Sequence, residues 1–475
     1  MFEENDRDFE EKAREEMVHR YEDLLRKKKP LYFDIDDFES IIDFYLDRNK
    51  VNSAYEATRI ASGLFPASPE IMLRKAQLLL DKGKPMEAII ELKNALLHDA
   101  QNFELYLMLG ISTLQLGNIK ESVRYFDDAV SRVDEDLKKD EILLSIGFHL
   151  GHAHKYNLAL KYLFRCLELN PENIDVLSEI SFCYDGLVQY DDSIMYYNKC
   201  IEIDPFAEHI WYNLGLIYSK TDQTDKAIES FDYALAIDPT YLSAYMAKAN
   251  IYLNLEKFSD AVKVYEAYLD YDAGYVDIHY YIGECYEKMN KLDLALLNYE
   301  NTIKKNEKHF EAWLGMGVIK MHLEDFSGSL IDLNKAITIE PTNPEAQYSL
   351  AELYLKTKKY KQGLIHVQIA IDSLPIEVDY FLLQSELYYA LKQFPDSISV
   401  LEKGLETVEE KAPIYYRLAG LLINDKTAKE AVSYLKIAKE SDNSLISDFL
   451  RIFPEAKKFV PFKGLLNLQD KKNKK

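Results

Sequence analysis

Small and apolar residues recur along most of the chain with a spacing of 34 residues. The pattern is clearest between Trp211 and Pro239, and counting in steps of 34 recovers it in both directions. Units start near residues 35, 69, 103, 140, 174, 208, 242, 276, 310, 344, 378 and 412, with three residues inserted near Asp134–Asp140. Self-similarity at a fixed period of this length is typical of a repeat architecture.

Small residues occupy two positions of nearly every unit. The twentieth position holds Ala54, Ala88, Ser122, Ala159, Ser193, Ala227, Ala261, Ala295, Ser329, Gly363, Ser397 and Ala431. The eighth holds Ile42, Ala76, Gly110, Gly147, Ser181, Gly215, Ala249, Gly283, Gly317, Ala351, Ser385 and Ala419. Small side chains where two helices cross let the backbones approach to about 8–10 Å. No segment alternates with period two for long, so strands are not predicted.

One unit carries the hallmarks of a known family. Its eight residues resemble the tetratricopeptide repeat at positions 4, 7, 8, 11, 20, 24, 27 and 32; they are Trp211, Leu214, Gly215, Tyr218, Ala227, Phe231, Ala234 and Pro239. The resemblance covers residues 35–445. It implies an all-α fold, an α-solenoid of about twelve helix–turn–helix units that form a right-handed superhelix with a concave groove.

The two ends are expected to cap this array. Residues 1–34 contain apolar positions spaced three to four apart, which predicts an amphipathic capping helix; they include Phe9, Ala13, Met17, Tyr21, Leu24 and Leu25. Residues 446–468 are read as a C-terminal capping segment with a proline break. Residues 469–475, QDKKNKK, form a basic tail that we expect to be disordered. A contact of this tail with acidic lipid or nucleic acid is the alternative.

Composition narrows the class of protein. Lys and Arg number 57 against 80 Asp and Glu, a net charge of -23, and 48% of residues are hydrophobic. The apolar fraction excludes a disordered acidic chain, and the charge does not suit nucleic-acid binding. Without a secretory signal or a long apolar run, we expect a cytoplasmic protein with no integral membrane association. The four cysteines, which form no CxxC pair, are expected to be buried reduced thiols: Cys166, Cys183, Cys200 and Cys285.

No catalytic motif stands out. The chain lacks the P-loop, GxGxxG, HExxH and GxSxG patterns, and the segments outside the repeats, of 34 and 30 residues, are too short for a catalytic domain. We therefore expect neither an enzyme nor a bound cofactor. His149, His152 and His154 could share a metal ion, but no ligand stands at suitable spacing, and we favour a solvated turn without metal.

The resemblance implies that positions 2, 5, 6, 9, 12 and 13 of each first helix face the groove. The dicarboxylate clamp that some family members use for acidic chaperone tails is not matched, because Ser178 and Ser243 flank Asn213 in the required slots. Position 2 is instead mostly acidic: Asp36, Glu70, Glu104, Glu141, Asp175, Asp277, Glu311, Glu345 and Asp379. These carboxylates either complement helix dipoles or form an acidic rim that steers basic partners.

Position 5 is mostly large and apolar from the third unit on: Leu107, Leu144, Tyr212, Met246, Tyr280, Leu314, Tyr348, Leu382 and Tyr416, with Ser178 as the exception. These side chains either line the groove floor or pack between neighbouring first helices. Tyrosines also gather near units seven and eight, where Tyr268 stands in a small-residue slot.

The sequence therefore predicts a non-catalytic scaffold that binds an extended or helical segment of another protein, basic or amphipathic in character, in the groove. A regulatory subunit of an enzyme complex whose catalytic part is another chain is the alternative. The predicted binding residues are Tyr212, Asn213, Leu216, Met246, Asn250, Asn254, Tyr280, Tyr281, Glu284, Glu287, Leu314 and Tyr348. Tyr and Met are common in interface cores.

Overall fold

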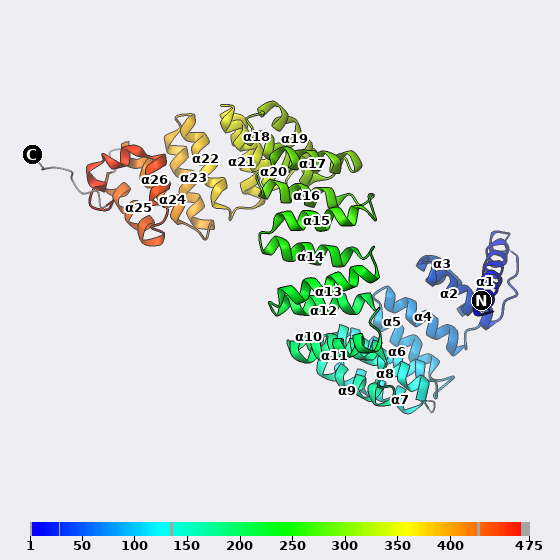
Figure 1. Cartoon of the computed structure of the whole chain (residues 1–475). Helices are drawn as coiled ribbons and strands as arrows, with labels where there is room; N and C mark the ends of the chain where they lie inside the picture. Colours follow the sequence, from blue (N-terminus) through cyan, green and yellow to red (C-terminus); the bar gives the residue numbers. More distant parts are fainter. Residues whose placement is uncertain (1, 28, 134–135, 425–427, 467–475) are drawn as a thin grey trace, which may run out of the picture. The chain divides into compact units, whose positions relative to one another are not determined.

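The computed structural model describes residues 2–27, 29–133, 136–424 and 428–466. Within these ranges every regular element is a helix, α1 to α26 with three short 3-10 helices, and there is no strand. The predicted all-α fold is confirmed. Figure 1 shows the helices following one another as hairpins with short turns.

The chain divides into two compact units, residues 1–251 and residues 252–475. The first unit contains α1 Phe2–Arg26, α2 Ile35–Asp47, α3 Val51–Leu64, α4 Pro69–Asp81, α5 Pro85–Ala95, α6 Phe103–Gln115, α7 Ile119–Ser131, α8 Asp136–His152, α9 Tyr156–Leu169, α10 Ile174–Gly186, α11 Tyr190–Ile203, α12 Glu208–Lys220 and α13 Thr224–Ile237. Helix α14, Leu242–Asn254, contains the boundary.

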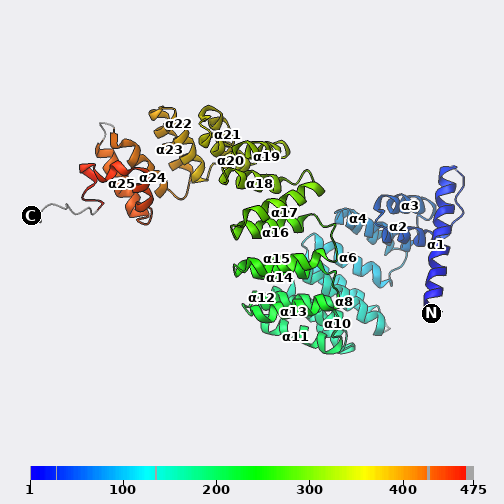
Figure 2. The same ribbon diagram turned by 45° about the horizontal axis from the view of Figure 1, so that its top comes forward.

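The second unit continues the same alternation, which can be followed in the turned view of Figure 2. It contains α15 Phe258–Leu269, α16 Asp277–Lys288, α17 Leu292–Lys305, α18 Phe310–His322, α19 Phe326–Ile339, α20 Pro344–Lys356, α21 Tyr360–Ser373, α22 Val378–Ala390, α23 Phe394–Thr407, α24 Ala412–Leu421, α25 Ala428–Ser441 and α26 Ile446–Ile452. The 3-10 helices are η1 Leu422–Asn424, η2 Pro454–Lys457 and η3 Val460–Phe462.

The small residues lie where the two helices of a hairpin touch. A Cβ atom added to Gly215 of α12 would lie 2.7 Å from the Phe231 ring of α13, and one added to Gly283 of α16 would lie 2.5 Å from the Tyr299 ring of α17. Both distances are shorter than real carbon contacts, so the aromatic rings occupy the space that a side chain would need. The sequence slots therefore describe a packing contact that repeats from hairpin to hairpin.

A residue in the left-handed conformation follows the first helix of eleven hairpins, from α2–α3 to α22–α23. Gly83 and Gly117 stand there with φ of 68° and 79°. Other hairpins place a residue with a side chain in the same turn: Asn49, His154, Val188, Asp222, Glu256, Asn290, Glu324, Lys358 and Lys392. Glycine adopts this conformation without steric cost, whereas a β-branched residue such as Val188 is strained in it.

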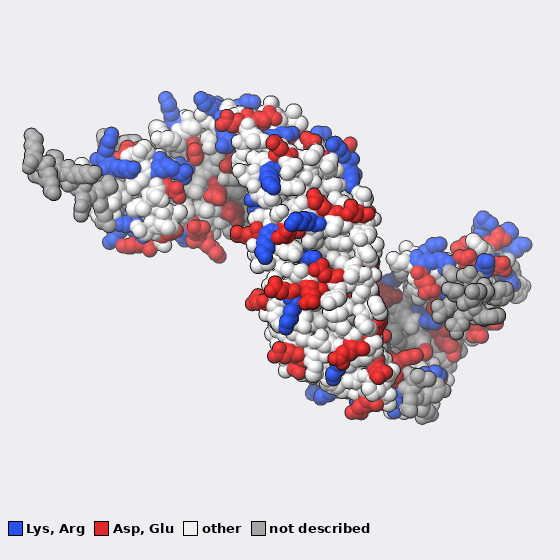
Figure 3. Space-filling view, viewed as in Figure 1, with Lys and Arg blue, Asp and Glu red and all other residues white. Residues whose placement is uncertain are grey.

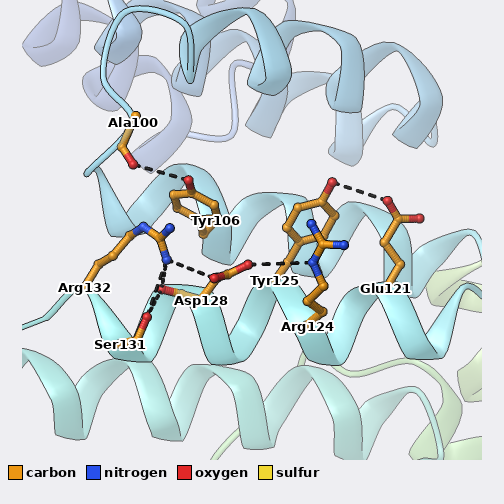
Figure 4. Close-up of polar contacts among 8 residues, drawn as sticks. All are labelled: Ala100, Tyr106, Glu121, Arg124, Tyr125, Asp128, Ser131 and Arg132. Carbon is orange, nitrogen blue, oxygen red and sulfur yellow. Dashed lines mark hydrogen bonds and ion pairs between the residues drawn. The ribbon is translucent and has the colours of Figure 1, made fainter.

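The fourth residue of several units ties the preceding loop to its first helix. The Tyr106 hydroxyl donates to the carbonyl oxygen of Ala100 over 3.2 Å, and Arg132 lies over the Tyr106 ring (Figure 4). Three other units repeat the bond to a carbonyl six residues upstream, through Trp211 to Pro205, Trp313 to Glu307 and Gln347 to Pro341. These bonds satisfy loop carbonyls that lie outside the helices.

Both ends pack on the neighbouring hairpins. In α1, Val18 and Tyr21 are buried against Phe33 and Phe38 of the first hairpin region. The spacing placed Leu25 on the apolar face of the capping helix. Its side chain is 39% exposed, because Leu25 lies in the last turn of α1. At the other end, Phe449 and Phe462 are buried in a cluster with α24 and α25. The basic tail, residues 469–475, lies outside the described residues.

Tyr268 occupies its small-residue slot as a buried side chain. It packs edge-on against Tyr275 at 6.0 Å between ring centroids, and its hydroxyl donates to Asp272 over 3.4 Å. Helix α15 ends at Leu269, and residues 270–276 form the connection to α16. The large side chain thus packs on its own connecting loop.

Charges are mixed on the visible surface. In Figure 3, Lys and Arg side chains are scattered among Asp and Glu, without a continuous basic area on the described part of that face. In the described ranges, no helix has both the length and the apolar run needed to cross a bilayer.

Candidate functional site

One pocket of the second unit lies along its first helices. It has a volume of about 280 Å³. Its lining residues come from α16, α17, α18 and α20: Tyr280, Glu284, Glu287, Lys288, Tyr299, Phe310, Glu311, Leu314, Gly315, Val318 and Glu345. Four of the predicted residues thus meet in one pocket, namely Tyr280, Glu284, Glu287 and Leu314.

Two tyrosines hold two of the carboxylates. The Tyr280 hydroxyl donates to Glu284 Oε1 over 2.8 Å, and the Tyr299 hydroxyl donates to Glu287 Oε2 over 2.8 Å. Burial, together with these glutamates, raises the pKa of both phenols, so they remain protonated donors at neutral pH. Each carboxylate therefore has one fixed hydrogen bond and keeps further acceptor capacity.

The pocket is acidic. Glu284, Glu287, Glu311 and Glu345 supply four carboxylates, and Lys288 is the one basic residue in its lining. Burial of the carboxyl group raises the pKa of Glu284, and the nearby Glu287 and Glu311 act in the same direction, whereas Tyr280 and Lys288 oppose it. The raised pKa means that burial makes the ionised form of Glu284 less favourable. A cation nearby would stabilise that ionised form.

Gly315 of α18 packs closely against the Tyr299 ring in the pocket lining. A Cβ atom on Gly315 would lie 2.8 Å from Cε2 of Tyr299, a distance that real Cβ atoms avoid. Leu314 and Val318 flank Gly315 on the same helix, and Leu314 is only 6% exposed. The missing side chain of Gly315 thus makes room for the buried Tyr299 ring, and Leu314 and Val318 add apolar atoms to the pocket lining.

The Tyr280 side chain is held in place by neighbouring aromatic rings. Its ring stacks on Tyr299 at 5.7 Å and lies 4.9 Å from the His309 ring. His309 caps α18 by accepting a hydrogen bond from the Ala312 amide at Nδ1 over 3.2 Å. The half-buried Tyr280 therefore belongs partly to the core and partly to the pocket surface.

The other predicted residues of the second unit do not line this pocket. Tyr281 stacks on Tyr265 at 5.6 Å, and Tyr348 lies 5.1 Å from the Tyr380 ring. Asn254 is exposed near the end of α14. Their place in a binding surface stays a prediction.

Five predicted residues belong to the first unit. Tyr212 is half-buried and packs on Phe231 and Tyr241, with ring centroids 5.9 and 5.2 Å apart. Asn213, Leu216 and Met246 are also half-buried, and Asn250 is exposed. All five lie on the first helices α12 and α14, and their role in binding also stays a prediction.

Seven of the eleven lining residues were not among the predicted binding residues. Glu311 and Glu345 stand at the acidic second position of their units, so their negative charge was predicted from the sequence. That they line one pocket together with Glu284 was not predicted. Lys288, Tyr299, Phe310, Gly315 and Val318 gave no such signal. Tyr299 and Gly315 act through a contact between α17 and α18, which a repeat pattern does not report.

A second pocket in this unit is smaller and apolar, about 100 Å³. Leu382, Tyr416, Phe449 and Ile452 are among its lining residues, and Arg417 at its side is paired with Glu386 over 2.9 Å. It offers a hydrophobic depression but little chemistry to identify an occupant.

His149 is half-buried, whereas His152 and His154 are exposed. The His152 ring lies 4.2 Å from Phe148 and 5.1 Å from Phe182, and burial lowers the pKa of His149. His154 occupies a left-handed turn. Across the described ranges, no group of three or more His, Cys, Asp or Glu residues has an arrangement that could hold a metal ion.

The four cysteines are free and buried. The Cys166 thiol donates to Asp140 Oδ1 over 2.6 Å, and burial raises its pKa. A protonated, buried thiol is a poor nucleophile and metal ligand. These positions contribute to packing.

Comparisons with known proteins connect the fold to one family. Sequence profiles of the tetratricopeptide repeat match residues 45–136 and 246–296, residues 174–206 and residues 210–241. None of the curated proteins matches the chain in sequence.

Several solved structures are similar. Yeast Tom70 shares 12% identity over 91% of this chain and 96% of its own, with a TM-score of 0.40. Cut9, from the APC/C hetero-tetramer Cut9–Hcn1, shares 12% identity over 88% of this chain and 96% of its own, with a TM-score of 0.39. YrrB, described as having an unusual peptide-binding site, shares 24% identity over 40% of this chain and 97% of its own, with a TM-score of 0.30.

Proposed function

Because the chain belongs to the tetratricopeptide repeat family, we propose that it is a non-catalytic scaffold that binds a segment of another protein. The segment lies against the first helices of the repeats, as an extended strand or a helix. Repeats of this family typically serve as protein-interaction modules. The observation that carries the proposal is the pocket along α16, α18 and α20, where the half-buried Tyr280 lies beside carboxylates that keep further acceptor capacity.

The partner segment is basic or amphipathic. The pocket lining has four glutamates against one lysine, and the whole chain has a net charge of -23. Charge complementarity of this kind steers association and fixes the register of the partner. Tyr212 and Met246 of the first unit and Tyr280 of the second are the proposed aromatic and apolar anchors.

The test is affinity purification of the full chain from a cell extract, followed by mass spectrometry and by titration of the recovered partner. Tyr212→Ala and Tyr280→Ala should each weaken binding by about 2 kcal/mol or more if these residues are hot spots. Tyr271→Ala is the matched control, because Tyr271 is 55% exposed in the connection before α16.

Tyr280 also packs in the core, so circular dichroism must show that its variants stay folded. Tyr280→Phe keeps the ring and removes only the bond to Glu284. Unchanged affinity in both alanine variants, with the fold intact, would reject the proposed surface.

A further inference from the structure

We infer that the pocket between α16, α18 and α20 receives one arginine side chain of the partner segment. The inference rests on the proposed function and specifies the residue that the pocket recognises. It assigns a role to Glu311 and Glu345, the two carboxylates that approach the pocket from the starts of α18 and α20.

Charge selects a cation. Glu284 and Glu287 of α16 each accept a hydrogen bond from a tyrosine, and Glu311 and Glu345 add negative charge from two further helices. Lys288 offsets only part of this charge. A cation that enters the pocket meets several carboxylates in partly enclosed surroundings, where the attraction is stronger than in open water.

Shape and donor number favour arginine over lysine. The carboxylates come from three helices, so an occupant needs donors that point in several directions. A guanidinium group offers five N–H donors in a flat fork and stacks on aromatic rings, whereas an ammonium group offers three donors at one point. Of the two tyrosines in the lining, only Tyr280 keeps exposed surface for such a flat group, because Tyr299 is fully buried.

Apolar side chains in the lining suit the alkyl part of the side chain. Leu314 and Val318 of α18 line the pocket together with the carboxylates. An arginine places three methylene groups beside such a surface while its head stays among polar atoms. The pocket volume of about 280 Å³ is large enough for one such side chain.

The experiment selects random peptides displayed on phage against the immobilised full chain. Selected peptides should share an arginine flanked by apolar residues. The same selection on the Glu311→Gln, Glu345→Gln double variant should lose the arginine preference. A double variant with Glu307→Gln and Glu377→Gln is the control, because both residues are exposed, belong to the same unit and lie outside the pocket lining.

A synthetic peptide from the wild-type selection then gives the magnitude. Loss of bonds between charged groups predicts that Glu311→Gln with Glu345→Gln weakens its binding roughly 10-fold to 100-fold. Replacing its arginine by lysine should weaken it less than replacement by citrulline, which keeps the shape and removes the charge. Circular dichroism of each variant confirms that the fold is retained.

The outcomes separate the two proposals. If no peptide is enriched on the wild-type chain, the proposed function fails, and this inference fails with it. If peptides are enriched without arginine, with lysine in its place, or with an arginine preference that survives in the pocket variant, the scaffold function stands and the arginine pocket is wrong.

Discussion

Val188 occupies the left-handed turn position that two other hairpins fill with glycine. Its φ is 61°, compared with 68° at Gly83 and 79° at Gly117. A β-branched residue in this region is strained by about 1–3 kcal/mol. We therefore expect Val188→Gly to raise the free energy of unfolding by about 1 kcal/mol after the entropy cost of glycine, measured by urea denaturation.

Gly117→Val is the reciprocal control and should lower stability by a similar amount or more. A loss of stability in Val188→Gly would show that the valine is not strained in solution.

Glu179 gives a pH-dependent prediction. Burial raises the pKa of Glu179 from 4.5 to about 7, Asp175 adds to the shift, and its Oε2 atom is buried without a hydrogen-bond partner. Below the unfolded pKa both states are protonated, so the group has no effect. As the pH rises towards 7 the folded state increasingly resists ionisation, and stability falls.

Glu179→Gln removes this cost. The variant should exceed the wild type by up to roughly 3 kcal/mol at pH 8, and the difference should vanish near pH 4. Parallel denaturation curves at the two pH values measure it. An equal difference at both would mean that the glutamate is not desolvated.

Single residues also mark the limit of prediction from sequence. Glu284 and Glu287 were predicted because they stand at positions 9 and 12 of their unit, which face the groove in the family that the chain resembles. Tyr299 stands in a packing slot, and the slot predicts a buried ring without predicting that its hydroxyl reaches Glu287. Contacts of this kind depend on the angle between hairpins, which the repeat pattern does not specify.

At the scale of elements, Gln347 joins three parts of the chain. Its side chain donates to the Pro341 carbonyl over 2.6 Å and bonds His366 of α21 over 2.7 Å, and it is 3% exposed. Gln347→Met keeps the length and leaves both partners unsatisfied. We expect a loss of about 2–4 kcal/mol in unfolding free energy.

The control is Gln362→Met, because Gln362 is exposed on α21. It should change stability by less than about 0.5 kcal/mol. Equal effects of the two substitutions would refute the role of the buried bonds.

Element lengths were only partly predictable. The inserted residues near 134–140 accompany a longer helix, α8 with 17 residues, where most first helices have 13. The insertion was visible in the sequence, but whether it would extend a helix or a loop was not. Residues 134–135 lie outside the described ranges.

For the whole molecule, the repeat period of 34 residues predicts that one repeat can be deleted without loss of the fold. His309 and Asn343 occupy the same capping position before α18 and α20. Removing residues 310–343 joins His309 to Pro344 in register, so the shortened array should fold with unchanged helicity per residue by circular dichroism. Stability in such arrays is a sum over neighbouring repeats.

The same deletion removes Glu311, Leu314 and Gly315 from the pocket. It should therefore abolish peptide binding while the fold survives. An unfolded product would show that the second unit depends on contacts beyond neighbouring hairpins.

The division at residues 251 and 252 was not predicted. The slots for small residues continue across it, with Ala249 before and Ala261 after, so the sequence shows one uninterrupted array. The positions for small residues predict contacts between the two helices of one hairpin. The division into two units depends on contacts between successive hairpins, which these positions do not predict.

The most direct test of the account is hydrogen–deuterium exchange of the full chain with and without a selected arginine peptide. Binding should slow exchange in α16, α18 and α20, whose side chains line the pocket, and leave α19 and α21 unchanged. Protection confined to the second helices, or no protection under saturating peptide, would contradict the claim that the first helices form the binding surface.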